Sequence, residues 1–210
     1  GGTALGLEAL AGNREHAEMV VNRAIADWGR IDALVNNAHT FTDFLALEDP
    51  KMEENCMTDF QSCFFGSLQL MQLCHPHMVK QGGGSVINMG TSYSIRCEPG
   101  FLAYAASKEA MRALTRTAAV EWGGFGITAN VICPSATSPA ARDYFEANPE
   151  MAKTLLQQVP AGRFGDAEKD IGPIAVFLAS DMSGYMSGNT VFADGASHIN
   201  GVAWRPEVED

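Results

Sequence analysis

Short apolar runs alternate with longer amphipathic stretches along most of the chain. Most of the apolar runs are bounded by Gly, Asn, Asp or Pro, and each is too short to form a helix. Runs of this kind are typical of strands that are buried on both faces of a sheet. They cover residues 4–10, 31–36, 85–89, 127–133 and 190–193.

The longer stretches between these runs have the spacing of helices. Helices are predicted over residues 14–28, 50–80, 104–122 and 170–178. Asn13 is the expected N-cap of the first helix and Gly29 its stop, Pro76 could break the second, and Gly123 and Gly124 close the third. Strands that alternate with helices predict an α/β fold built on a doubly wound, mostly parallel sheet.

Length and composition narrow the class of protein. The 210 residues, 46% of them hydrophobic, can bury one sizeable core, so we expect a single domain over 1–210. Lys and Arg number 14 against 25 Asp and Glu, and the formal net charge of -11 argues against a nucleic-acid surface. No uncharged apolar run approaches the roughly 20 residues of a membrane span. Five cysteines without a C-x-x-C pair favour reduced thiols in the cytoplasm over disulfides or a zinc site.

Tyr104 and Lys108 stand four residues apart at the start of the third predicted helix. Their side chains therefore project from one face, about a turn apart. A nearby ammonium favours the phenolate form of tyrosine, which lowers the tyrosine pKa and suits the hydroxyl to proton transfer with an alcohol or carbonyl oxygen. The same spacing also occurs on solvated helix faces, so the pair alone does not identify a catalytic site.

Other polar or small residues come directly after three of the predicted strands. They are Asn37, Ala38 and His39 after 31–36, Thr91 and Ser92 after 85–89, and residues 134–139 after 127–133. In a parallel α/β sheet the ligand crevice lies beyond the carboxyl ends of the strands. The sequence therefore predicts that these residues converge with Tyr104 and Lys108 at one edge of the sheet.

Six motifs follow one another without gaps across nearly the whole chain. They are Leu34-Val35-Asn36-Asn37-Ala38, Gly84-Ser85-Val86-Ile87-Asn88, Pro99-Gly100 followed by Tyr104-Ala105-Ala106-Ser107-Lys108, Asn130-Val131-Ile132-Cys133-Pro134, Pro160-Ala161-Gly162-Arg163-Phe164-Gly165, and Ser187-Gly188-Asn189-Thr190 with Asp194-Gly195. In order and spacing they resemble the short-chain dehydrogenases/reductases, a match far more specific than any single motif. The resemblance implies a Rossmann-like fold.

The resemblance also implies an activity and a set of site residues. The activity is hydride transfer between NAD or NADP and a small alcohol or carbonyl substrate. Tyr104 would be the general acid/base, Thr91 would supply a second catalytic hydroxyl, and Lys108 would hold the nicotinamide ribose and lower the pKa of Tyr104. Cofactor contacts are implied for Asn37 and Ala38 on the adenosine side, for Pro134, Ala136 and Ser138 on the nicotinamide side, and for Tyr104 and Lys108. The two long helices look like those with which the family forms dimers and tetramers, so a homodimer or homotetramer is expected.

Four positions depart from the family's pattern. Thr91 stands where the family has its catalytic serine, and activity could survive because threonine keeps the donor hydroxyl. Cys63 stands where the family has a helix asparagine that supports a proton relay to the lysine through water, and cysteine is a poor hydrogen-bonding substitute. His39 and Ser135 each replace a glycine.

The largest departure is at the amino end. The chain has no initiator Met and starts near the family's third strand, so roughly 50 residues, including the phosphate-cradling glycines, have no counterpart and the chain is expected to be truncated. Leu10 stands where the family places an aspartate near the adenine. Without their usual neighbours, residues 4–10 are expected either to pair with 31–36 or to be displaced. A non-catalytic protein that kept the scaffold and lost the dinucleotide site is the alternative function.

Several remaining residues have an ordinary structural interpretation. His75 and His77 have no third ligand spaced near them, so surface histidines are favoured and no metal site is predicted. Cys63 and Cys74 are interpreted as small buried residues rather than reactive thiols, because no basic cluster surrounds them in sequence.

Residues 135–165 are expected to form an excursion from the domain. Phe145, Met151, Leu155 and Leu156 lie in this segment, where the family has a mobile lid over its substrate. A lid and the ordinary packing of short helices explain these four residues equally well.

Overall fold

Four parallel strands form the central sheet of the computed structural model, which describes residues 2–96, 98–137, 143 and 145–199. Their order is β1 (Ala33–Asn36), β2 (Gly84–Met89), β3 (Ile127–Pro134) and β6 (Thr190–Ala193). All three ladders are parallel, so the strands end at the same edge. The predicted α/β class and four of the five predicted strands are confirmed.

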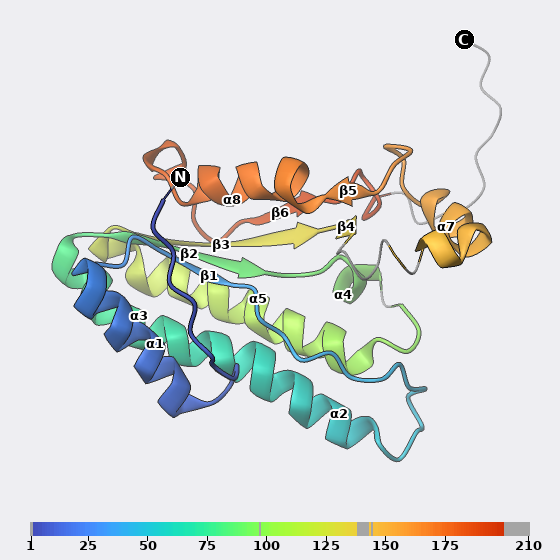
Figure 1. Ribbon diagram of the computed structural model, residues 1–210, viewed down its shortest axis with the longest axis horizontal. Helices are drawn as coiled ribbons and strands as arrows, with labels where there is room; N and C mark the ends of the chain where they lie inside the picture. The colour runs from blue at the N-terminus through green and yellow to red at the C-terminus, as the bar shows by residue number, and fades with distance from the viewer. Residues whose placement is uncertain (1, 97, 138–142, 144, 200–210) are drawn as a thin grey trace, which may run out of the picture.

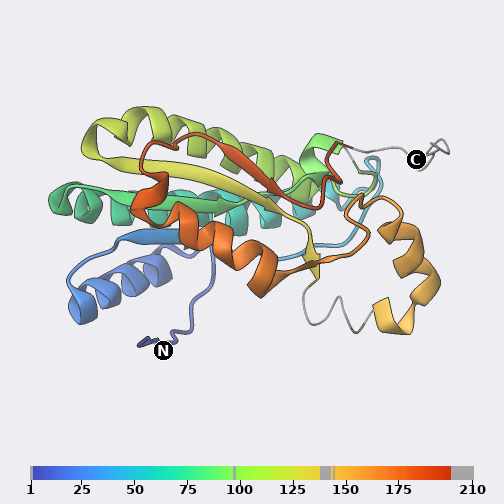
Figure 2. The same ribbon diagram turned by 90° about the horizontal axis from the view of Figure 1, so that it is seen from above.

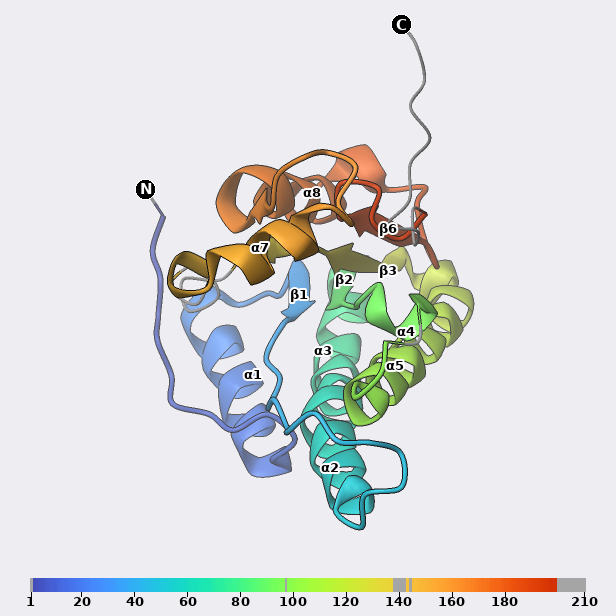
Figure 3. The ribbon, with the colours of Figure 1, turned by 90° about the vertical axis from the view of Figure 1, so that its right-hand side faces the viewer.

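Helices cover both faces of this sheet (Figure 1). On one face lie α1 (Arg14–Trp28), α3 (Gly66–Gln81) and α5 (Leu102–Trp122), and on the other lies α8 (Gly172–Leu178), as Figure 3 shows end on. Successive strand residues point to opposite faces. Val86 accordingly packs in the core with Met71 and Met78, whereas Ile87 packs with Leu178.

Helix α1 begins and ends where the sequence predicts. The Asn13 side chain accepts a hydrogen bond from the backbone N–H of His16 at 3.0 Å, which satisfies one of the free donors of the first turn. Gly29 ends the helix at φ 73°, and its N–H bonds to the carbonyl of Ile25.

The second predicted helix is one continuous run, but its irregularity does not lie at Pro76. The run consists of α2 (Met52–Asp59), a π-helical stretch (Phe60–Phe65) and α3, and Pro76 lies inside α3. The predicted break at Pro76 is therefore wrong. The carbonyl of Gln72, which loses its helical donor to Pro76, belongs to an exposed residue and can bond to water.

The third predicted helix has additional structure at both ends. The loop before it contains a one-turn helix, α4 (Tyr93–Arg96), and α5 itself starts at Leu102. After Trp122 a 3-10 turn (Gly123–Phe125) leads to Gly126, which takes the left-handed conformation at φ 74° and ends the segment.

Residues 4–10 do not form the predicted strand. Residues 2–10 have no regular secondary structure and are exposed, and β1 pairs with β2 alone among the strands described. Gly6 and Glu8 interrupt the apolar run, and glycine in a strand interior weakens it. Of the two expected arrangements, the segment adopts the displaced one.

The excursion after β3 lies beyond the carboxyl edge of the sheet. Short strands β4 (Ala136–Thr137) and β5 (Gly165–Asp166) pair in parallel, and α7 (Pro149–Leu156) lies past the strand ends (Figure 2). The chain returns to the sheet through a π-helical turn (Ala167–Ile171) ahead of α8 and a 3-10 turn (Asp181–Ser183) ahead of β6. This excursion places α7 on the same side of the molecule as the strand ends.

Candidate active site

The hydroxyl groups of Tyr104 and Thr91 meet at the carboxyl edge of the sheet. Thr91 follows β2 and is 6% exposed, Tyr104 lies in the first turn of α5, and the Thr91 side chain interacts with that of Tyr104. Thr91 Oγ1 also accepts a bond from the backbone N–H of Tyr93 at 3.2 Å, whereas among the described residues the Ser92 side chain has no hydrogen-bond partner. Burial raises the pKa of Tyr104 to about 12, although the bond with Thr91 opposes the shift.

Lys108 lies one turn further along α5 and is 3% exposed. Its Nζ donates to the carbonyl oxygen of Met89 at 2.6 Å and lies 5.7 Å from the centre of the Tyr104 ring. Burial lowers the pKa of Lys108, and a hydrogen bond with Cys63 opposes that shift. The sequence predicts a lowered tyrosine pKa, but the pKa of Tyr104 is raised, because loss of water around the phenol outweighs its favourable partners.

A hydrogen-bond network fixes the loop that carries Thr91. Ser94 Oγ donates to the carbonyl oxygen of Thr91 at 2.9 Å and to Glu109 Oε1 at 2.7 Å. Arg112 Nη1 donates to the same carboxylate oxygen at 2.6 Å. Since Glu109 and Arg112 belong to α5, the loop and the Tyr104 helix are held as one unit.

His39 and Asp59 form a pair that the sequence analysis did not anticipate. His39 Nε2 lies 2.6 Å from Asp59 Oδ1, and Asp59 is fully buried at the end of α2. The His39 ring centre lies 4.9 Å from that of Tyr104 at 67°. Burial and the charge of Lys108 lower the pKa of His39, although Asp59 opposes the shift. An acidic residue one helical turn before Cys63 was the available sequence signal.

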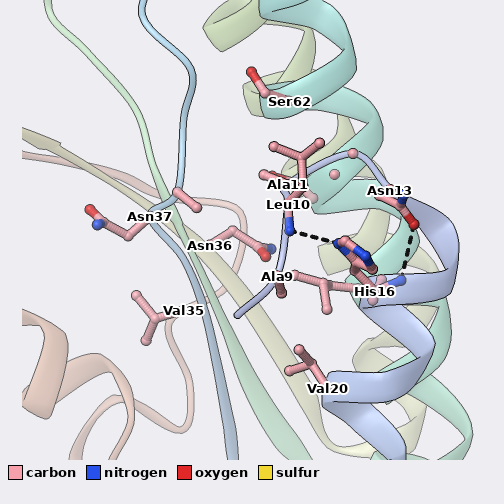
Figure 4. A pocket seen from close by; sticks show the side chains of 16 residues that line it. Ala9, Leu10, Ala11, Asn13, His16, Val20, Val35, Asn36, Asn37 and Ser62 are labelled. Atoms are coloured by element: carbon pink, nitrogen blue, oxygen red, sulfur yellow. Dashed lines mark hydrogen bonds between the residues drawn. The ribbon is translucent and has the colours of Figure 1, made fainter. Parts of the chain in front are cut away.

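A pocket of about 130 Å³ lies beside β1 (Figure 4). It is enclosed by the turn at 9–13, the first turns of α1, the end of β1 and part of α3. Asn37 and Ala38, expected on the adenosine side, are exposed and line it. Leu10 also lines it, and its backbone N–H donates to His16 Nδ1 at 2.9 Å.

The residues expected on the nicotinamide side follow β3. Pro134 ends that strand, Ser135 bonds through its N–H to the carbonyl of Ala193 at 2.9 Å, and Ala136 starts β4. Cys133, directly before them, interacts electrostatically with both Tyr104 and Lys108. The end of β3 is therefore next to the catalytic candidates, and Ser138 lies outside the described residues.

The thiols and histidines that were given ordinary roles lie in packed positions. Cys74 is buried in the core, and burial raises its pKa to about 11. Cys63 is also buried, but its contact with Lys108 makes it part of the candidate site. His75 is half-buried against Trp122 and Phe125 rather than lying on the open surface. The described part of the chain contains neither a cluster of three potential metal ligands nor a helix able to cross a membrane.

Comparisons with known proteins agree on one family. Residues 2–198 match the enoyl-(acyl carrier protein) reductase family. The chain is 36% identical over 183 residues to a 12alpha-hydroxysteroid dehydrogenase of Clostridium sp., covering 87% of this chain and 70% of that protein. It is 34% identical over 184 residues to the 3-oxoacyl-(acyl-carrier-protein) reductase FabG of Thermotoga maritima, covering 87% and 72%. A gluconate 5-dehydrogenase of Burkholderia cenocepacia, solved with NADP and tartrate, is similar with a TM-score of 0.80 at 28% identity, over 89% of this chain and 72% of that one.

Proposed function

Because the chain belongs to the short-chain dehydrogenase/reductase family and is therefore an NAD(P)-dependent oxidoreductase, we propose that Tyr104 is its general acid/base, with Thr91 and Lys108 beside it. The substrate is an alcohol in one direction and a carbonyl compound in the other. The observation that carries the proposal is that Thr91, at the end of β2, and Tyr104 interact at the carboxyl edge of the sheet, with the Lys108 ammonium 5.7 Å from the centre of the Tyr104 ring.

In this proposal the substrate oxygen meets two hydroxyl groups. Thr91 Oγ1 accepts the Tyr93 N–H, so its own proton is directed to Tyr104 in the resting site and can turn to a substrate oxygen when a substrate binds. During carbonyl reduction the Tyr104 Oη–H bond breaks and its proton goes to the substrate oxygen, and during alcohol oxidation the phenolate takes a proton back. Burial keeps Tyr104 protonated at neutral pH, so the resting site is set for donation.

The residues around this edge fit a nicotinamide dinucleotide. Asn36 Oδ1 is a buried acceptor without a partner among the described residues, and Asn36 lines the pocket together with Asn37 and Ala38. Lys108 can donate to ribose hydroxyls as well as to Met89. When bound, the nicotinamide would supply the hydride in reduction and accept it in oxidation. No lysine or arginine is among the residues that line the pocket, so the lining residues provide no cationic side chain for the pyrophosphate of the dinucleotide.

The surroundings of Tyr104 favour a substrate with an apolar part. Phe41 lies 5.5 Å from the Tyr104 ring centre, Phe44 packs on Phe41, and both are more than half exposed. Arg96 Nη2 donates to Gln158 Oε1 at 3.0 Å and so connects the Thr91 loop to the segment after α7. We assign 135–165 as the substrate lid on this basis.

Exposed apolar side chains and free thiols support our proposals for the assembly and the location of the protein. Met57 and Phe65, on the run from α2 to α3, are exposed although apolar, which supports a homodimer or homotetramer through these helices. Four cysteines of the described part of the chain are free thiols, which supports a cytoplasmic location.

The test is turnover by the purified chain with NAD or NADP and a panel of alcohols and ketones, including a hydroxysteroid, a 3-oxoacyl thioester and a sugar acid. Formation or loss of reduced nicotinamide is followed by absorbance. Tyr104→Phe keeps the packed ring and removes only the transferable proton, so we expect the rate to fall on the order of a hundredfold or more. Full turnover by this variant, folded by circular dichroism, would overturn the assignment.

A further inference from the structure

A buried carboxylate and imidazole lie directly behind Tyr104. Asp59 is completely buried, and its two oxygens contact different residues. Oδ1 lies 2.6 Å from His39 Nε2, and Oδ2 accepts a hydrogen bond from Thr42 Oγ1 at 2.7 Å. The His39 side chain is 10% exposed, so its ring is nearly enclosed but not sealed from solvent.

The His39 ring packs against two aromatic rings at the carboxyl edge of the sheet. Its ring centre lies 5.7 Å from Phe41 at 87° and 4.9 Å from Tyr104 at 67°. Asp59 ends α2, and Cys63, one turn later in the same helical run, interacts electrostatically with Lys108. The pair is therefore packed against Tyr104, and the helical run that carries Asp59 also reaches Lys108 through Cys63.

His39 and Asp59 could simply hold the loop after β1 in place, but that role does not require ionisable residues. The Thr40 N–H donates to Ser62 Oγ at 3.2 Å, and Asn55 Nδ2 donates to the carbonyl of Asp43 at 2.9 Å, so the loop is already bound to α2 and the turn after it. A buried carboxylate is costly unless it is paired, and an apolar residue fills such a position at lower cost. A role that needs a proton explains the pair better.

We propose that His39, oriented by Asp59, is a positioning residue for proton transfer at Tyr104: it gains a proton when the phenolate forms and loses it when the phenol is restored. The inference rests on the proposed function of Tyr104. Asp59 fixes the Nε2–H of the neutral ring, so Nδ1 is the atom that takes up the additional proton. The resulting imidazolium would balance the phenolate at a distance where opposite charges interact strongly.

The proton balance of this cycle is simple. In carbonyl reduction the Tyr104 Oη–H bond breaks, the proton forms an O–H bond on the substrate, and a solvent proton forms an N–H bond at His39 Nδ1. When the site resets, His39 releases that proton and Tyr104 Oη takes one up. One solvent proton is thus consumed for each carbonyl reduced, and His39 makes no bond to the substrate.

The resting charges around His39 set the starting point of this cycle. Burial and Lys108 lower the pKa of His39, so the ring is neutral at neutral pH while Tyr104 holds its proton. The titratable groups that face or interact with this cluster are Cys56 and Asp59 from α2, Cys63 from the π-helical stretch, Tyr93 from α4, Tyr104 and Lys108 from α5, and Cys133 from β3.

Nuclear magnetic resonance tests the charge coupling without cofactor or substrate. Tyr104→Glu places a carboxylate where the phenolate would form, and Tyr104→Gln is its neutral match. With nitrogen-labelled histidine, we expect the pKa of His39 to be higher in the Glu variant by about one unit or more, with Nε2 protonated in the neutral ring. Equal pKa values in the two folded variants would overturn the proposal, whatever the outcome of the turnover assay.

Kinetics with His39→Gly tests the role in turnover. The variant should lower kcat about tenfold or more at neutral pH with little change in KM, because only proton transfer loses its compensating charge. Added imidazole should restore the rate, and Asn55→Ala, which removes a bond that fastens the same loop but involves neither His39 nor Asp59, should retain it. A folded His39→Gly enzyme that keeps the wild-type rate, or that imidazole does not rescue, would show a structural role only. If wild type gives no turnover, the proposed function fails separately.

Discussion

Tyr104 and Lys108 have altered acidities because α5 buries both side chains. Each group loses water, which disfavours its charged form, so the phenol stays protonated to higher pH and the pKa of the ammonium falls. Thr91 and Cys63 oppose these shifts through hydrogen bonds to Tyr104 and Lys108 respectively. The chemistry of the site therefore depends on how each side chain is packed as well as on which residue types are present.

Thr91, rather than the neighbouring serine, is expected to supply the second catalytic hydroxyl. Its hydroxyl interacts with Tyr104, whereas the buried Ser92 side chain makes no hydrogen bond to another described residue. Thr91→Val keeps the shape and removes the donor, and should reduce kcat by roughly a hundredfold. Ser92→Ala should leave it nearly unchanged. Both variants are assayed at saturating dinucleotide, and greater damage from Ser92→Ala would reverse the assignment.

Because Tyr104 is buried, the folded chain is expected to lose stability as the pH rises into the alkaline range. A free tyrosine has a pKa of about 10, and Tyr104 has one of about 12 in the folded chain. The folded state therefore binds this proton more tightly, a contribution that is complete below about pH 10 and is lost between about pH 10 and 12. It amounts to roughly 2 to 3 kcal/mol.

Urea unfolding of wild type and Tyr104→Phe across this pH range measures that contribution. The thiols Cys74 and Cys133 titrate in the same range but are present in both proteins, so the difference isolates Tyr104. The free energy of unfolding should fall less steeply with pH in the variant. Parallel curves would mean that the Tyr104 pKa is not raised.

At the scale of elements, the sequence predicts regular segments well and long-range partners poorly. The N-cap at Asn13 and the strand at 190–193 could be predicted because capping and strand patterns are local. The displaced segment 4–10 was not, because an apolar run becomes a strand only if a neighbour pairs with it. The pair of His39 and Asp59 was missed for the same reason, since twenty residues separate them and only the packing of α2 brings them together.

The turn at Gly12 joins α1 to the helical run that carries the site. Gly12 has φ 83°, and a Cβ added there would lie 2.2 Å from the backbone oxygen of Gln61. Gly12→Ala should therefore lower the free energy of unfolding by about 3 kcal/mol or more. Gly29→Ala is the matched control, because Gly29 has φ 73° but open space around it, and should cost about 1 kcal/mol. Equal urea midpoints for the two variants would contradict the clash.

At the scale of the whole molecule, the parallel sheet gathers the site at one edge. The ends of β1, β2 and β3 contribute the pocket residues, Thr91 and the segment after Pro134, although these are far apart in sequence. Parallel order makes this convergence automatic, which is why the sequence could predict that the candidate residues lie at one edge although it could not predict their contacts. The pocket at β1, however, presents neutral groups and His16 but no lysine or arginine.

The pocket has no lysine or arginine, and Asn13 already caps the helix N-terminus that lines it, which predicts weak dinucleotide binding by the 210-residue chain. A pyrophosphate is normally held by several charge-assisted hydrogen bonds from a helix N-terminus and glycine-rich backbone, each worth about 1.5 to 3 kcal/mol. Calorimetric titration with NAD and with NADP, alongside a relative such as the Thermotoga maritima reductase, should show far weaker binding to this chain. A micromolar dissociation constant for either dinucleotide would contradict the prediction.

The side of β1 that faces away from β2 affects the solubility of the protein. Among the strands described, none pairs with that side, and Val35 is 47% exposed there. Backbone groups left open in this way are a template on which an extended segment of another molecule can add as an extra strand. Ala33-Leu34-Val35-Asn36 contains no charge and no proline, the residues that normally block such growth. At high protein concentration we therefore expect aggregation through this short edge strand before any loss of the folded core.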